Sequence, residues 1–195
     1  MENSLQIAKV IGIPIKIHIS FLLVLPFFAW VFAMQPEPFG FAEIESGLLK
    51  YSLSLLTAIL LFVSVLIHEL AHSYFSLRYG GSIKEITLYL IGGVSAMEKE
   101  LRDPSNEAKM AFVGPLSSII LGISLLLFNY IFSSTISPSG ENPLFLMTFI
   151  LGYINIILGL FNLIPAFPMD GGRILRAFFA QRMGFVEATE KAALI

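Results

Sequence analysis

Residues 51–78 read YSLSLLTAILLFVSVLIHELAHSYFSLR and decide the fold of this 195-residue chain. The part that ends at Ile67 contains no charged side chain, and the segment is longer than the ~20 apolar residues that cross a bilayer as a helix. Tyr79-Gly80-Gly81 follows, which is typical of a helix end. The sequence therefore predicts a membrane-spanning helix over about residues 50–76.

The composition extends this prediction to the whole chain. Hydrophobic residues make up 56% of it and charged residues only 13%, whereas soluble domains carry about 25% charged residues. Residues 110–140 and 142–169 contain no charged side chain. Further spans are predicted near residues 20–35, 107–132 and 143–163. We expect an α-helical multi-pass membrane protein with about five to six spans.

Two segments have the pattern of β-strands. Residues 13–20, IPIKIHIS, alternate strictly, so that four isoleucines share one face of a strand. Residues 83–91, IKEITLYLI, are rich in β-forming residues and lie between glycine pairs, which predicts a strand or one arm of a hairpin. Short membrane-associated strands should therefore accompany the helices.

Charge and cysteine content exclude several classes of protein. The net charge of −2 and the lack of a basic stripe argue against nucleic acid as a partner. Without cysteine, a metal ion must use nitrogen and oxygen ligands. The segment after Asp170 is basic and amphipathic, and the residues from Glu187 resemble a helix cut short. We expect residues 1–195 to form a single transmembrane core whose natural chain continues.

The distribution of basic residues predicts the topology. With the N-terminus in the cytoplasm, all 12 Lys and Arg residues except Lys50 fall in segments on the cytoplasmic side. Such a bias is the positive-inside signal of membrane proteins. The second and fourth spans then end at the cytoplasmic face, which places His68, His72 and Asp170 on the same side of a cell membrane.

The sequence His68-Glu69-Leu70-Ala71-His72 has the spacing of a zinc hydrolase motif. Residues four apart on a helix point in similar directions, so both imidazoles can reach one ion. Glu69 lies about 100° round the helix and can take a proton from water at the metal. The alternative is a set of interfacial polar residues with Glu69 paired to Arg78. That alternative requires two of only three histidines to fall at ligand spacing by accident.

A catalytic zinc ion needs a third protein ligand, for which His18, Asp103 and Asp170 are candidates. Asp103 lies in a run of charges typical of a solvated loop, and His18 lies on the polar face of a predicted strand. Asp170 follows an uncharged stretch, so a carboxylate there needs a partner, and a dication suits it best. The alternative role for Asp170 is the N-cap of the following helix.

Asn155 and Asn162 share one face of the fourth predicted span. Interhelical hydrogen bonding is the common role of such residues in membrane bundles, and we favour it for Asn155. For Asn162 a second role is equally supported, as a donor to a substrate carbonyl or its oxyanion.

Together with further motifs, these residues resemble those of the site-2 protease family of intramembrane zinc metalloproteases, prokaryotic type. The resemblance spans nearly the whole chain. It is carried by His68 to His72, by residues 161–173 (FNLIPAFPMDGGR), by Gly92-Gly93-Val94, by Gly114-Pro115 and by the leader GIPIKIH at residues 12–18.

The resemblance implies a set of roles. His68, His72 and Asp170 would hold one zinc ion, Glu69 would be the general base, and Asn162 would help to position the substrate. It also implies cleavage of membrane-spanning protein substrates in regulated intramembrane proteolysis.

A peptide bond inside an intact helix is shielded, so the substrate must be unwound. We expect the strand at residues 83–91 to be an edge strand that pairs with the unwound substrate, with Gly92 and Gly93 as a turn that contacts it.

A membrane zinc transporter is the alternative function. It should carry further His, Asp or Glu residues on other spans as a relay, and residues 110–132 of the third predicted span contain none. An inactive scaffold would not require Glu69.

Overall fold

The computed structural model describes residues 3–90, 92–99, 101, 103–136 and 142–194. Six helices and four strands are present in this part of the chain. In chain order they are β1 (Ser4–Val10), β2 (Ile13–His18), α1 (Phe21–Met34), α2 (Gly47–Arg78), β3 (Ser82–Tyr89), β4 (Gly92–Lys99), α3 (Pro104–Ile136), α4 (Pro143–Asn162), α5 (Asp170–Ala180) and α6 (Phe185–Ala193).

Three of the described helices, α2, α3 and α4, are long and apolar enough to cross a membrane. The first predicted span forms the shorter α1, whose 14 residues reach only about 21 Å, against about 30 Å of hydrocarbon. The multi-pass helical class is confirmed. The predicted count of five to six spans is not, because the described residues provide three spanning helices and one short apolar helix.

The four strands form one sheet in the order β1-β2-β3-β4, in which β2 and β3 are parallel and the outer pairs are antiparallel. The predicted strands are confirmed as β2 and β3, and β3 is indeed one arm of a hairpin. The expectation that residues 83–91 are an edge strand is wrong, because β3 lies between β2 and β4. Gly92 and Gly93 are not a turn either, since they begin β4 and pair with Tyr89 and Leu88.

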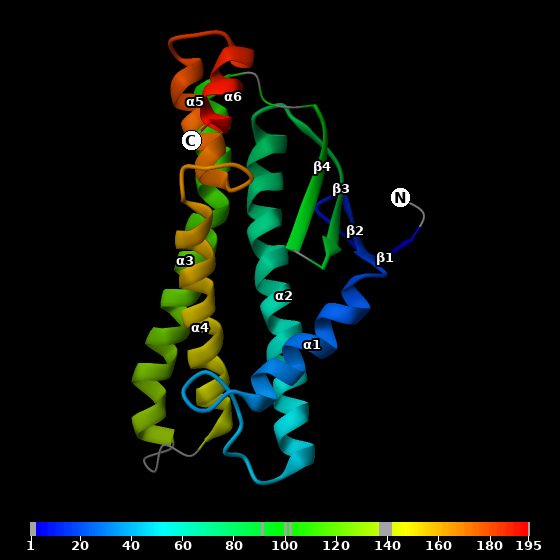
Figure 1. Ribbon diagram of the computed structural model, residues 1–195, viewed down its shortest axis with the longest axis vertical. Helices are drawn as coiled ribbons and strands as arrows, with labels where there is room; N and C mark the ends of the chain where they lie inside the picture. Colours follow the sequence, from blue (N-terminus) through cyan, green and yellow to red (C-terminus); the bar gives the residue numbers. More distant parts are fainter. Residues whose placement is uncertain (1–2, 91, 100, 102, 137–141, 195) are drawn as a thin grey trace.

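The sheet packs its apolar face against the second half of α2, beside which it lies in Figure 1. Ile13, Ile15 and Ile86 are buried there against Leu66 and Leu70 of α2. The strict alternation of β2 therefore has its expected cause, a strand with one buried face.

One isoleucine of the predicted set lies outside this arrangement. Ile19 follows the last residue of β2 and is 57% exposed.

The helices pack in a bundle in which α3 and α4 run side by side on one flank of α2 (Figure 1). Buried apolar residues of α1, α2 and α4 share one cluster. Asn155 of α4 is fully buried and donates to Ser64 Oγ of α2 over 3.1 Å, so the interhelical role predicted for it is confirmed. The helix ends follow from local sequence: Ser46 caps α2, and Gly80 adopts a φ of +84° just after it.

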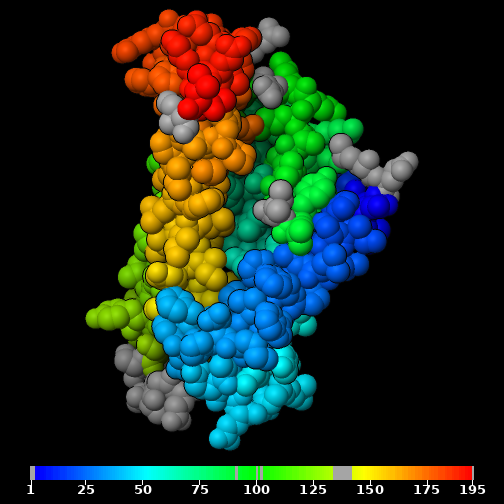
Figure 2. Space-filling model, in the orientation of Figure 1, coloured from blue at the N-terminus to red at the C-terminus, as the bar shows by residue number. Residues whose placement is uncertain are grey.

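The space-filling view shows how this packing leaves α2 accessible. In Figure 2, α2 (teal) lies at the bottom of a recess between α4 (yellow) and β4 (green), with α1 (blue) crossing below. The amphipathic α5 and α6 cover the upper end of the bundle (Figure 1). The end of α2 that carries His68 and His72 therefore lies between the sheet and the loop that leads into α5.

Candidate metal centre

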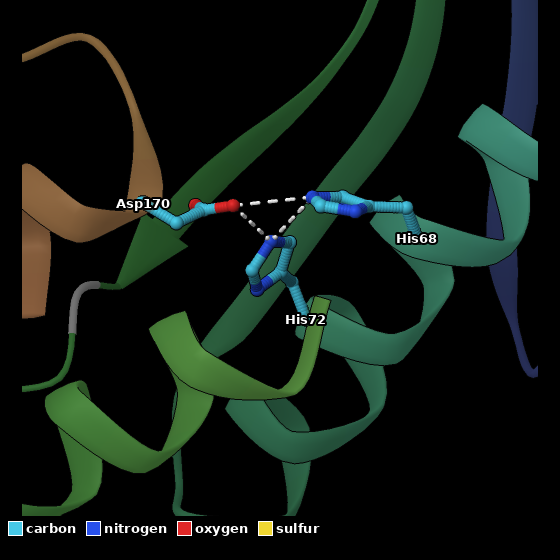
Figure 3. A group of neighbouring side chains, drawn as sticks. All are labelled: His68, His72 and Asp170. Atoms are coloured by element: carbon cyan, nitrogen blue, oxygen red, sulfur yellow. Dashed lines mark hydrogen bonds and ion pairs between the residues drawn. The ribbon is translucent and has the colours of Figure 1, made fainter. Parts of the chain in front are cut away.

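His68 and His72 lie one turn apart on α2, and both are buried, with 5% and 3% of their surface exposed. Asp170 is the first residue of α5 and points its carboxylate at both imidazoles (Figure 3). The Oδ2 atom of Asp170 is 3.1 Å from Nε2 of His68 and 3.0 Å from Nε2 of His72. The two Nε2 atoms are 3.1 Å apart. Three potential ligand atoms thus converge on one point.

This triangle fits a zinc ion. Ligand atoms about 2.0–2.1 Å from a tetrahedral zinc ion lie roughly 3.3–3.4 Å from one another. The observed separations of 3.0 to 3.1 Å need to widen by only a few tenths of an ångström. Two imidazoles and one carboxylate are also a ligand set of known catalytic zinc sites, which keep a fourth position open.

The other ring nitrogens of the two histidines are held by α3. His72 Nδ1 lies 2.7 Å from the carbonyl oxygen of Met110, and His68 Nδ1 lies 2.9 Å from Oγ of Ser118. A carbonyl only accepts, so Nδ1 of His72 must carry the proton, which leaves the lone pair of Nε2 for a metal. The backbone of α3 therefore selects the tautomer of His72 that can bind an ion.

Gly114 explains how α3 can approach so closely. A Cβ atom at this position would overlap the imidazole ring of His72. The Gly114-Pro115 pair, one of the features of the resemblance, thus lies inside α3 directly against the metal group.

Asp170 is not an N-cap, which corrects the alternative role considered for it. The N-cap residue of α5 is Met169, and Asp170 lies in the first turn with its carboxylate on the histidines. Burial opposes ionisation of this carboxyl, but the neighbouring imidazoles of His68 and His72 outweigh burial and hold its pKa below the usual value. An ionised carboxylate is the form that binds a metal ion.

Glu69 is half-buried and turns toward the sheet rather than toward Arg78. Its Oε2 accepts a hydrogen bond of 2.7 Å from Ser95 of β4, whereas Arg78 donates to Tyr74. The Cγ of Glu69 also packs so closely on Gly93 that a Cβ at Gly93 would lie 2.6 Å from it. The predicted alternative of an ion pair between Glu69 and Arg78 is therefore wrong.

Comparison with known proteins identifies the family of this chain. The family model described as Peptidase family M50 matches residues 56–142 and 130–195. This chain belongs to peptidase family M50. The resemblance to site-2 proteases inferred from the motifs is confirmed.

Two relatives match this chain over almost its whole length. The zinc metalloprotease MJ0392 of Methanocaldococcus jannaschii is 39% identical over the whole chain, which corresponds to 51% of its own length. The putative zinc metalloprotease Rip3 of Mycobacterium tuberculosis is 32% identical over 94% of the chain and 46% of its own length. The chain thus spans about half the length of these curated relatives.

A solved structure supports the same assignment. The site-2 protease from M. jannaschii has 38% sequence identity and a TM-score of 0.66, with 97% of this chain and 77% of that chain covered.

The remaining candidates do not join the metal group. His18 contacts Ser20 and the ring of Tyr89, and Asp103 caps α3 by accepting from the backbone N–H of Asn106. Asn162 is half-buried and donates to the carbonyl of Leu158 in its own helix.

Sequence reasoning missed three residues on α3 and β4 that hold the histidines and Glu69 in place. Ser118 and Ser95 carry no motif that separates them from ordinary serines, and Met110 acts through its backbone. The zinc-transporter alternative is not supported, since His68, His72 and Asp170 form the one group of this kind among the residues that the structure describes.

Proposed function

We propose that this chain is the core of an intramembrane zinc metalloprotease that hydrolyses peptide bonds in or near membrane-spanning segments of protein substrates. The observation that carries this proposal is the convergence of His68, His72 and Asp170, next to Glu69, near one end of a helix long enough to cross a bilayer. Relatives named as zinc metalloproteases support it. Residues 1–195 would act as one transmembrane metalloprotease core.

His68, His72 and Asp170 would hold one zinc ion. When bound, zinc supplies Lewis acidity that makes water a nucleophile near neutral pH and polarises a carbonyl. Glu69 would accept a proton from the attacking water while the water oxygen bonds to the carbonyl carbon of the substrate. It would then give that proton to the leaving amine as the C–N bond breaks. Glu69 follows His68 directly in α2 and is half-buried, so its carboxylate can reach this water while the helix stays intact.

The substrate must present an extended backbone, and the sheet offers an edge for it. The edge nearest the metal group is β4, because Ser95 and Gly93 of this strand touch Glu69. We therefore assign substrate pairing to β4 in place of β3, with Gly92 and Gly93 as backbone contacts. Asn162 remains our candidate for positioning the substrate carbonyl, after a rotation that frees its amide from Leu158.

We also propose that the site opens to the cytoplasm in a cell membrane, as the distribution of Lys and Arg predicts. The lack of cysteine allows a direct test with single cysteines at two exposed positions, Glu45→Cys and Gln181→Cys. A membrane-impermeant thiol reagent should label Gln181→Cys only from the cytoplasmic side and Glu45→Cys only from the opposite side. The reverse pattern would contradict the topology.

The decisive experiment is Glu69→Gln in the full chain with a single-span substrate. Glutamine keeps the size of the side chain but cannot take the proton, so cleavage should fall at least about 100-fold while one zinc ion per chain is retained. Zinc flux into vesicles, measured in parallel, should be absent from both wild-type and variant. Cleavage at the wild-type rate by Glu69→Gln would refute the mechanism.

A further inference from the structure

Ser95 connects the sheet to the proposed general base. It lies in β4, where it pairs with Ile86 of β3, and its hydroxyl donates to Oε2 of Glu69 over 2.7 Å. The two residues are 26 positions apart in sequence. Since β4 ends the strand order of the described sheet, Ser95 belongs both to the free edge and to the surroundings of Glu69.

A second serine orients this contact. Ser73 of α2 is fully buried, and its Oγ lies 3.4 Å from Oγ of Ser95. A hydroxyl has one hydrogen to donate, and that of Ser95 is directed to the carboxylate. Ser73 is then left as the donor in the pair, so the hydrogen bonds run from Ser73 to Ser95 to Glu69.

The position of Glu69 requires such a restraint. A glutamate side chain has several rotatable bonds, and its carboxylate is itself a good zinc ligand. Glu69 follows His68 directly, so an unrestrained carboxylate can swing to the metal group and occupy the open position. Gly93 packs against Cγ of Glu69 on one side, and the hydrogen bond from Ser95 holds Oε2 of Glu69 in place.

We propose that Ser95 is a positioning residue that holds the carboxylate of Glu69 off the metal group and in line with a substrate paired to β4. The inference rests on the proposed function, because it assigns Glu69 the role of base. The same strand then carries the pairing edge and the residue that sets the base. β4 therefore sets the distance between the backbone of a paired substrate and the carboxylate of Glu69.

Two replacements of Ser95 and one control variant test this in the zinc-loaded full chain with a single-span substrate. Ser95→Ala should lower kcat about tenfold, with KM and zinc content unchanged, because neither the free edge nor the ligands are altered. Ser95→Thr keeps the hydroxyl and should restore kcat. The control Ser124→Ala removes an exposed hydroxyl that donates to Ile120 of its own helix, and it should leave kcat unchanged.

A double-mutant cycle separates positioning from packing. Glu69→Asp shortens the side chain beyond the reach of Ser95, so Ser95→Ala should reduce kcat much less in that background than in the wild type. Equal losses in both backgrounds would mean that Ser95 does not act through Glu69, and would overturn the inference.

Three further outcomes decide the remaining cases. If Ser95→Ala fails to fold, Ser95→Cys keeps the shape of the side chain but offers only a weak donor, and wild-type kcat in that variant would overturn the inference. Wild-type cleavage by Ser95→Ala, together with an inactive Glu69→Gln, would refute only the role of Ser95. Unimpaired cleavage by Glu69→Gln would refute the proposed function itself.

Discussion

The Nδ1 atom of His68 lies 2.9 Å from the hydroxyl of Ser118, a contact that joins α2 to α3 across 50 residues of sequence. Both groups are buried, with Ser118 only 2% exposed. The Nε2 atom of the same ring faces Asp170. Ser118 therefore holds the ring of His68 with Nε2 toward Asp170, and its hydroxyl can accept a hydrogen bond from Nδ1, as the carbonyl of Met110 does from His72.

Replacement of Ser118 should weaken metal binding. Ser118→Ala removes the partner of Nδ1, so the ring of His68 is no longer held in its orientation, and zinc affinity should fall about 10- to 100-fold. Competition with a chelator of known affinity measures this fall. Cleavage in excess zinc should recover in large part, because Glu69 and all three ligands remain. A zinc affinity equal to that of Ser124→Ala would contradict the role of Ser118.

Gly114 should be intolerant of a methyl group. A Cβ atom in Gly114→Ala would overlap the ring of His72, so either the ring or α3 must shift. We expect the variant to lose most bound zinc and nearly all cleavage, as measured by metal analysis and the single-span substrate. The matched control is Gly47→Ala, because a Cβ there meets nothing within 4 Å. Zinc binding by Gly114→Ala at the level of Gly47→Ala would show that the close approach has no functional consequence.

The parts of the fold that sequence reasoning predicted are those with strong periodic signals. The long uncharged segments gave α2, α3 and α4, and the alternation of residues 13–18 gave β2. By contrast, β1 reads SLQIAKV and is exposed along most of its length, so no alternation marks a buried face. β4 reads GGVSAMEK, in which Gly, Ser and charged residues resemble a loop. Without β4, the central position of β3 could not be foreseen.

The metal group was more predictable than its surroundings. Helical spacing paired His68 with His72, and the count of basic residues brought Asp170 to the same face. The groups that orient them come from α3 and β4 through long-range packing. The carbonyl of Met110 has no sequence signal at all, because every residue carries one. Ser95 and Ser118 became distinguishable only from their positions in space.

The ion pair between Arg176 and Glu107 should stabilise the position of Asp170. The guanidinium donates from Nε and Nη2 to Oε1 of Glu107, which is 2% exposed, and lies 4.8 Å from the ring centroid of Phe185. It thereby links α5, which begins at Asp170, to α3 and α6. Arg176→Ala should destabilise the fold by about 3 kcal/mol, because a buried carboxylate loses the two hydrogen bonds and the charge that this guanidinium supplies.

Thermal unfolding and zinc content test this link. Arg176→Ala should unfold at a lower temperature and bind less zinc, and Arg176→Lys should recover only part of both, because lysine lacks the planar fork of arginine. The control is Arg182→Ala, which removes an exposed arginine that lies just after α5 and stacks on Phe178 of that helix. Equal unfolding temperatures for Arg176→Ala and Arg182→Ala would refute the role of the ion pair.

Pairing of the substrate with β4 should leave a periodic signature in the substrate itself. Alternate residues of a strand direct their N–H groups toward its neighbour, and proline has no N–H to donate. Single prolines placed along the unwound segment should therefore reduce cleavage at every second position, whereas alanines at the same positions should not. The measurement is initial cleavage rate for each substrate with the wild-type chain. A period of three to four residues would indicate that the substrate is bound as a helix, and a uniform effect would exclude pairing with β4.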